Sequence, residues 1–102
     1  MTPIEDLRDK VAIVTGATKG MGRSTAILLA RSGAKVIATG RSEEAGAETA
    51  EMMRAAGGEG LFMRQDVTVE ADLKKACEAA LSEFCGLDIL VNNAGVFLFK
   101  PI

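Results

Sequence analysis

The chain contains no histidine, tryptophan or tyrosine, and only two of its 102 residues are cysteines. Without histidine it lacks the commonest metal ligand of proteins and the commonest general base of enzymes. Cys77 and Cys85 stand at positions i and i+8, which fits neither a redox CxxC pair nor a zinc site. We therefore interpret both as small, partly buried thiols, and the sequence predicts no metal centre.

Long apolar runs and blocks of like charge are also missing. The 12 basic and 14 acidic residues nearly cancel, so we expect no nucleic-acid partner. Residues 1–10 carry five charged side chains and no apolar signal region, and no later run approaches the roughly 18 apolar residues of a membrane span. These absences predict a cytoplasmic protein without a membrane segment.

The sequence does contain short apolar segments that alternate with helical patterns. Such segments, apolar over nearly their whole length, are typical of parallel strands covered on both faces by crossover helices. The length fits one domain, so we predict a single domain over residues 1–102. The four predicted strands are Lys10–Thr15, Lys35–Thr39, Gly60–Gln65 and Asp88–Asn92.

Helix start and stop signals lie between these strands. Gly33 is placed to end the first helix, and Ser42 to cap the second, with Glu43 and Glu44 in its first turn. The predicted helices are Gly20–Ser32, a second one from Ser42 to the glycines at 57 and 58, and a third from a Thr68 cap to about Phe84. We therefore expect an α/β, Rossmann-type doubly wound parallel sheet with strand order 3-2-1-4 and three crossover helices. A ligand crevice should lie beyond the carboxyl ends of strands one and four.

A glycine motif joins the first strand to its helix. Gly16, Gly20 and Gly22 have the spacing GxxxGxG. Gly16 permits a tight turn, Gly20 lets backbone N–H groups approach a pyrophosphate, and Gly22 allows close helix packing. The alternative is a plain glycine-rich turn, whereas an ATPase loop is excluded because no Gly-Lys-Ser/Thr follows. The motif predicts a dinucleotide site.

The end of the second strand indicates which dinucleotide. NAD-specific folds place an acidic residue there to accept the ribose 2′-hydroxyl. This sequence instead has Gly40 followed by Arg41, and Lys19 lies in the glycine loop, so two cations are available for a 2′-phosphate. We therefore predict NADP(H) in preference to NAD(H). Arg41 as a solvated charge remains an alternative, and Glu43 or Glu44 could reach a ribose, although both fit better as partners of the helix dipole.

Three segments together resemble the N-terminal half of the short-chain dehydrogenase/reductase family. They are the glycine segment Thr15–Gly22, the pair Asp66-Val67 after the third strand, and Asn92-Asn93-Ala94-Gly95 after the fourth. They occur in the order and spacing of that family, and the resemblance runs from Leu7 to Ile102. It implies an oxidoreductase that transfers hydride, of the alcohol dehydrogenase or carbonyl reductase type.

The resemblance also implies roles for individual residues. Asp66 and the Val67 backbone would contact the adenine amino group, although Asp66 could also be an ordinary helix-entry residue. Asn92 and Asn93 could brace neighbouring strands. The residues expected along the phosphates and adenosine ribose are Gly16, Thr18, Lys19, Gly20 and Met21, and those expected beneath the ribose units are Asn93, Ala94 and Gly95.

Catalysis in this family uses a Ser, a Tyr and a Lys, and a chain without tyrosine cannot supply the phenol. We therefore predict no catalytic residue and no activity of this chain alone, and expect the catalytic part of the domain beyond Ile102. The apolar fourth strand would then be an exposed edge, and Val96–Phe99 would need a cover. The alternative is a non-catalytic dinucleotide-binding or interaction module that associates with itself or with a partner chain. A methyltransferase-like domain fits Lys19 and Arg41 less well.

Overall fold

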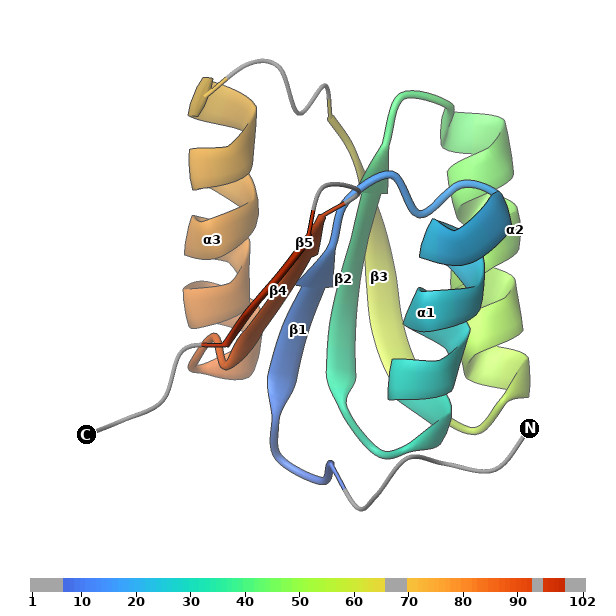
Figure 1. Ribbon diagram of the computed structural model, residues 1–102, viewed down its shortest axis with the longest axis horizontal. Helices are drawn as coiled ribbons and strands as arrows, with labels where there is room; N and C mark the ends of the chain where they lie inside the picture. Colours follow the sequence, from blue (N-terminus) through green and yellow to red (C-terminus); the bar gives the residue numbers. More distant parts are fainter. Residues whose placement is uncertain (1–6, 66–69, 93–94, 99–102) are drawn as a thin grey trace.

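The computed structural model describes residues 7–65, 70–92 and 95–98 of the chain. Within these ranges it contains three helices and five strands (Figure 1). The elements are β1 (Val11–Val14), α1 (Gly20–Arg31), β2 (Lys35–Gly40), α2 (Glu43–Ala55), β3 (Glu59–Arg64), α3 (Glu70–Phe84), β4 (Ile89–Asn92) and β5 (Gly95–Leu98). Strands and helices alternate as far as β4, which confirms the predicted α/β class.

The five strands form one sheet with the order β3-β2-β1-β4-β5. β1 pairs in parallel with β2 and with β4, so that Ile13 lies opposite Ile37 on one side and Leu90 on the other. β2 and β3 are also parallel. The predicted order 3-2-1-4 is thus confirmed for the four parallel strands. Figure 1 shows α1 and α2 on one face of the sheet and α3 on the other.

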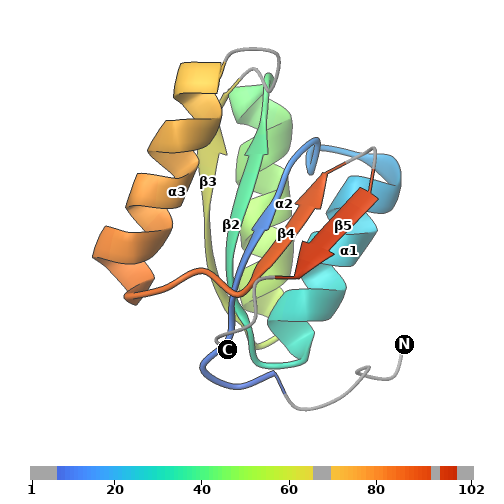
Figure 2. The same cartoon turned by 60° about the vertical axis from the view of Figure 1, so that its left-hand side comes forward.

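β5 corrects the expectation for the fourth strand. Gly95–Leu98 pairs antiparallel with Ile89–Asn92, and this hairpin adds a fifth strand beside β4 (Figure 2). β4 therefore lies between β1 and β5, and the prediction that it would be an exposed edge was wrong. The apolar segment was interpreted as a tail, but its valine and phenylalanine are residues that favour strands, and it adjoins a strand whose backbone groups can pair with it.

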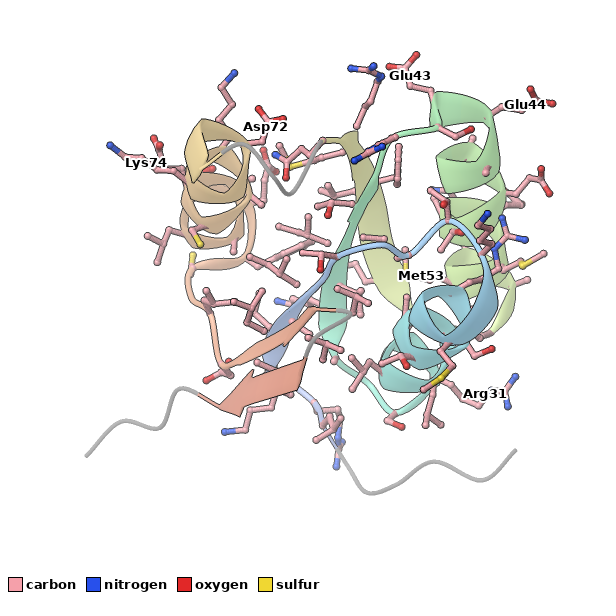
Figure 3. The ribbon with its side chains drawn as sticks, turned by 45° about the horizontal axis from the view of Figure 1, so that its top comes forward. Arg31, Glu43, Glu44, Met53, Asp72 and Lys74 are labelled. Carbon is pink, nitrogen blue, oxygen red and sulfur yellow. The ribbon has the colours of Figure 1, made fainter. Side chains whose placement is uncertain are left out.

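Side chains of the strands alternate between two apolar layers. Ala12 and Val14 of β1 face α1 and α2, whereas Val11 and Ile13 face α3. Met53 of α2 is completely buried in the first layer (Figure 3). No helix in the described part of the chain is long and apolar enough to cross a membrane. Both faces of the parallel strands are therefore covered by helices, as the apolar patterns predicted.

The signals for helix ends are confirmed. The Ser42 side chain accepts a hydrogen bond from the backbone N–H of Ala45, so it caps the start of α2. Gly33 follows α1 with φ +103°, and Gly57 follows α2 with φ +89°, the left-handed conformation of a helix C-terminus. The predicted Thr68 cap lies outside the described residues and remains a prediction.

Candidate functional site

A cavity of about 700 Å³ lies at the carboxyl ends of β1, β2 and β3. The segment after β1 and the start of α1 supply most of its wall, and residues at the ends of β2 and β3 supply the rest. The residues that line it are Gly16, Thr18, Lys19, Gly20, Met21, Gly22, Gly40, Arg41, Ser42 and Gln65. The crevice was predicted at the ends of the first and fourth strands; the cavity is present at the end of β1, but it extends toward β2 and β3, and the part of β4 that the structure describes supplies no residue of its wall.

The glycine loop has the geometry that its spacing predicts. Gly16 and Gly20 have φ of +62° and +59°, which strongly favours glycine at both positions. A Cβ atom at Gly22 would overlap the carbonyl oxygen of Gly16, so the loop touches the helix where residue 22 has no side chain. A Cβ atom at Gly20 would meet no atom of the described residues within 4 Å. The loop therefore packs tightly against α1 at Gly22, whereas there is free space beside Gly20, which lines the cavity.

The start of α1 lines this cavity, and its first backbone N–H groups have no acceptor within the helix. Lys19 occupies the N-cap position with an extended backbone, and its side chain makes no capping hydrogen bond. The first backbone bond of the helix runs from Arg23 N to Lys19 O at 3.3 Å, and the N–H groups before it have no acceptor within the helix. The first turn contains no acidic residue. The helix end is therefore a positive pole that suits an anion.

Charge along the cavity has one sign in the described part of the chain. Lys19 and Arg41 line it, and no acidic side chain of the described residues does so. Glu43 and Glu44 lie in the first turn of α2, exposed and outside the cavity wall. Figure 3 shows Glu44 pointing away from the sheet. The arrangement favours an anionic ligand.

Two residues of the wall were missed from sequence. Ser42 was predicted as a helix cap, and its role in α2 does not prevent it from lining the cavity. Gln65 follows β3, and its backbone N–H donates to the Gly40 carbonyl at 2.7 Å. Its side chain is buried, and its Nε2 has no hydrogen-bond partner in the described part of the chain. A polar residue at the carboxyl end of a predicted strand was the available signal.

A network of buried and half-buried hydrogen bonds holds the glycine loop. The N–H of Ala17 donates to the carbonyl of Thr39 at 2.9 Å, and its carbonyl accepts from the Thr49 hydroxyl at 2.8 Å. Arg23 donates from Nε to the same hydroxyl and from Nη2 to the Ala45 carbonyl, both at 2.9 Å. The backbone of β2 and the Thr49 side chain of α2 therefore hold Ala17, and Arg23 of α1 holds Thr49 in turn.

The other predicted site residues remain predictions. Gly95 is the first residue of β5, where it pairs with Asn92. The predictions for four other residues lie outside the described part of the chain; these are Asp66, Val67, Asn93 and Ala94. The structure thus brings together the members of the glycine motif and Arg41, and the adenine contacts expected of Asp66 and Val67 remain predictions.

Comparison with known proteins agrees with this geometry. The model of the short chain dehydrogenase family matches residues 10–102. A 3β-hydroxysteroid dehydrogenase of Mediterraneibacter gnavus is 49% identical over 89 residues, which are 86% of this chain and 32% of that protein. The chain therefore spans about a third of the length of this curated relative.

Solved structures show the same fold at substantial identity. The apo form of a glucose dehydrogenase of Caenorhabditis elegans is 44% identical with a TM-score of 0.81, over 85% of this chain and 38% of that one. An actinorhodin polyketide ketoreductase, solved with NADPH, is 34% identical with a TM-score of 0.78, over 82% and 32% of the two chains. The family model, the sequence relatives and the fold agree: this chain belongs to the short-chain dehydrogenase family of oxidoreductases, whose members use NAD(H) or NADP(H).

Proposed function

We propose that this chain binds NADP(H) in the cavity at the start of α1, as part of an oxidoreductase that interconverts an alcohol and a carbonyl compound. The observation that carries the proposal is the position of Lys19 and Arg41 on the wall of one cavity, with Gly40 beside them. The two cations come from different loops, one before α1 and one after β2. Folding therefore concentrates positive charge where the glycine loop is open.

The cavity fits the diphosphate of a dinucleotide in shape and in charge. Its volume of about 700 Å³ lies within the usual range of small-molecule sites. The uncapped start of α1 offers backbone N–H donors, and the absent side chain at Gly20 leaves space for close approach. Lys19 adds a charge at the same helix end. These features support Gly16, Lys19, Gly20, Met21 and Gly22 as the phosphate-binding residues.

The preference for NADP(H) over NAD(H) rests on Gly40 and Arg41. An acidic residue at the end of β2 would accept the ribose 2′-hydroxyl of NAD and repel a 2′-phosphate. Here that position is glycine, and the guanidinium of Arg41 offers planar, paired donors that match a phosphate. The NADPH in the related polyketide ketoreductase is in keeping with this choice. From the family resemblance we add Thr18, Asp66, Val67, Asn93, Ala94 and Gly95 as contacts of the adenosine and ribose units.

The bound nicotinamide would supply or accept a hydride, and the residues of this chain would hold the nucleotide in place. The family transfers the accompanying proton through a tyrosine phenol, and none of the 102 residues is tyrosine. We therefore propose that the 102-residue chain binds the nucleotide but does not turn over substrate.

Calorimetric titration of the chain with four nucleotides tests the proposal. NADPH and NADH differ by the 2′-phosphate, and so do adenosine 2′,5′-bisphosphate and 5′-AMP. We expect NADPH to bind more tightly than NADH. Replacing Arg41 by Asp should weaken NADPH and the bisphosphate by roughly 10- to 100-fold, because a charge-assisted hydrogen bond contributes about 1.5–3 kcal/mol.

Lys74→Asp is the matched control for Arg41→Asp. Lys74 is an exposed residue of α3, on the opposite face of the sheet, and its replacement changes the net charge by the same amount (Figure 3). The NADPH to NADH affinity ratio should not change in this variant. An unchanged ratio in Arg41→Asp would remove Arg41 from the site, and an absence of saturable binding by every nucleotide would refute the proposal.

A second candidate is a dinucleotide-binding module without chemistry of its own that pairs with itself or with another chain. The observation that favours it is that β3 and β5 form the two edges of the described sheet. Sedimentation of the purified chain distinguishes a monomer from such an assembly. Incubation with NADPH and a simple ketone should give no turnover in either case, and a measurable rate would contradict both readings.

A further inference from the structure

The backbone conformation of Gly40 does not require glycine. It is the last residue of β2, where it pairs with Arg64 of β3, and its carbonyl accepts the N–H of Gln65. The glycines with left-handed φ in the described part of the chain are Gly16, Gly20, Gly33 and Gly57. Gly40 is not among them, so its conformation is open to any L-amino acid.

The neighbour that excludes a side chain at this position is Thr18. A Cβ atom added to Gly40 would lie 2.5 Å from Cγ2 of Thr18, a distance at which two carbon atoms overlap. The same added atom would lie 3.6 Å from Cβ and 3.6 Å from Oγ1 of Thr18, which is ordinary contact. One methyl group therefore occupies the space that a side chain at residue 40 would need.

The backbone of Thr18 is poorly able to withdraw from this contact. The preceding peptide is fixed by the bonds of Ala17 to Thr39 and Thr49, and Gly16 is packed against Gly22. Rotation about the Cα–Cβ bond of Thr18 could relieve the overlap, but two of the three staggered positions place a heavy atom toward Gly40. A β-branched side chain also has few rotamers to choose from. Relief by movement of the loop would break buried hydrogen bonds.

We propose that Thr18 is a specificity-determining residue, because its methyl group keeps any side chain, and hence any carboxylate, out of the end of β2. We call this pair the Thr18–Gly40 contact. The inference rests on the proposed NADP(H) site, since an acidic residue at this strand end is the feature that selects NAD(H). Nucleotide preference is then set by shape as well as by charge. Changing Gly40 alone cannot convert the site, whereas changing residues 18 and 40 together can.

A double-mutant cycle on the nucleotide-free protein tests the steric part. Thermal unfolding is measured for the parent chain, Gly40→Ala, Thr18→Ala and the double variant. We expect Gly40→Ala to lower Tm by about 4–8 °C in the parent, because forcing a methyl into occupied space destabilises a small domain by that order. In the Thr18→Ala background the same change should leave Tm unchanged or raise it slightly, because alanine restricts the unfolded chain.

Gly86→Ala is the matched control for this cycle. Gly86 has no left-handed φ, and a Cβ atom there would meet no atom within 4 Å. Its replacement should therefore have the same small effect on Tm with either residue at position 18. Equal Tm losses for Gly40→Ala in both backgrounds, or no loss in either, would overturn the Thr18–Gly40 contact.

The nucleotide arm uses Gly40→Asp with and without Thr18→Ala, titrated with NADPH and NADH. The double variant should show the larger shift of the affinity ratio toward NADH, at least several-fold beyond Gly40→Asp alone. Equal shifts in the two variants would refute Thr18 as a determinant. If the parent chain binds no dinucleotide, the proposed function and this role of Thr18 both fail, while the Tm cycle still decides whether the contact exists. If the parent binds NADPH but the cycle shows no coupling, the function stands and the inference fails.

Discussion

The two faces of the sheet are covered in different ways. Toward α1 and α2 the strands contribute small residues such as Ala12 and Ala38, and the helices add further buried alanines. Toward α3 the strands contribute larger side chains, Ile13, Ile37 and Leu90 among them. On the first face Arg23 of α1 donates a half-buried hydrogen bond to Thr49 of α2, and Thr49 donates a buried one to the carbonyl of Ala17 in the glycine loop.

Because of this difference, we expect the two faces to contribute differently to the stability of the fold and to nucleotide binding. Small side chains let α1 and α2 approach the sheet closely, which brings the helix start and the glycine loop to the cavity. The α3 face buries more apolar volume per strand residue and lies away from the cavity wall. We therefore expect changes on the α3 face to alter stability alone, and changes on the α1 and α2 face to alter both stability and nucleotide binding.

The largest effect should come from Ile13→Ala on the α3 face. Ile13 is completely buried between the neighbouring strands and α3, and its truncation leaves a cavity. We expect the free energy of unfolding to fall by about 2–5 kcal/mol in urea titrations. The NADPH to NADH affinity ratio should be unchanged. Ile13→Val, with an expected loss of about 0.5–1.5 kcal/mol, keeps the test usable if the alanine variant does not fold. A changed NADPH to NADH affinity ratio in the valine variant would contradict the expectation that the α3 face affects stability alone.

Gly22→Ala should have the next largest effect, and on both properties. The added methyl would overlap the Gly16 carbonyl and lie 3.1 Å from the Cα of Ala17, so α1 must move away from the loop. We expect a loss of about 1–3 kcal/mol in stability and weaker binding of NADPH and NADH alike. Ser24→Ala, on the exposed side of α1, is the control and should be neutral or slightly stabilising. Unaltered binding by a folded Gly22→Ala variant would argue against a phosphate site at this helix end.

Thr49→Val tests the hydrogen bonds that join the helices to the loop. The change removes the donor to the Ala17 carbonyl and the acceptor of Arg23 Nε while it preserves the shape of the side chain. We expect a loss of about 1–3 kcal/mol in stability, because buried groups lose their partner. NADPH affinity should fall by roughly threefold to tenfold, which is about 0.7–1.4 kcal/mol. Thr49→Ser keeps the hydroxyl and should retain the affinity. An equal loss in Thr49→Ser, which keeps the hydroxyl, would show that these hydrogen bonds do not account for the effect.

Local signals predicted the fold because they depend on near neighbours along the chain. Ser42 caps α2 and Gly33 ends α1 through contacts within a few residues, and both were identified from sequence. β5 was missed because an apolar segment such as 96–98 can be a strand, a tail or part of a core, and its composition does not decide between them. Its pairing with β4 depends on the tertiary structure.

The part of the site that could be predicted from the sequence is the glycine loop, because the spacing of a glycine motif determines the backbone geometry of its loop. The left-handed backbone of Gly16 and the close packing of Gly22 follow from the glycine spacing. The contact of Thr18 with Gly40 joins residues 22 positions apart and depends on how the loop lies over β2, so no pattern shows it. The sequence showed that Gly40 replaces an acidic residue, and the structure adds that the Thr18 methyl group occupies the space that a side chain there would need.

The smallest effect on stability should come from Gln65→Leu. Gln65 lies at the end of the sheet, on the cavity wall, so the comparison of the two helix-covered faces does not predict its effect. The Gln65 side chain is buried, but its Nε2 has no partner in the described part of the chain, so no hydrogen bond of that nitrogen is lost there. Replacing a buried polar group by an apolar one of similar size is then nearly neutral, and we expect less than about 0.5 kcal/mol in urea unfolding of the nucleotide-free chain. A loss above about 2 kcal/mol would show that the amide is satisfied by the protein itself. A neutral change in stability with weaker NADPH binding would instead identify the amide as a ligand contact, because the desolvated donor is then paired only when the nucleotide is bound.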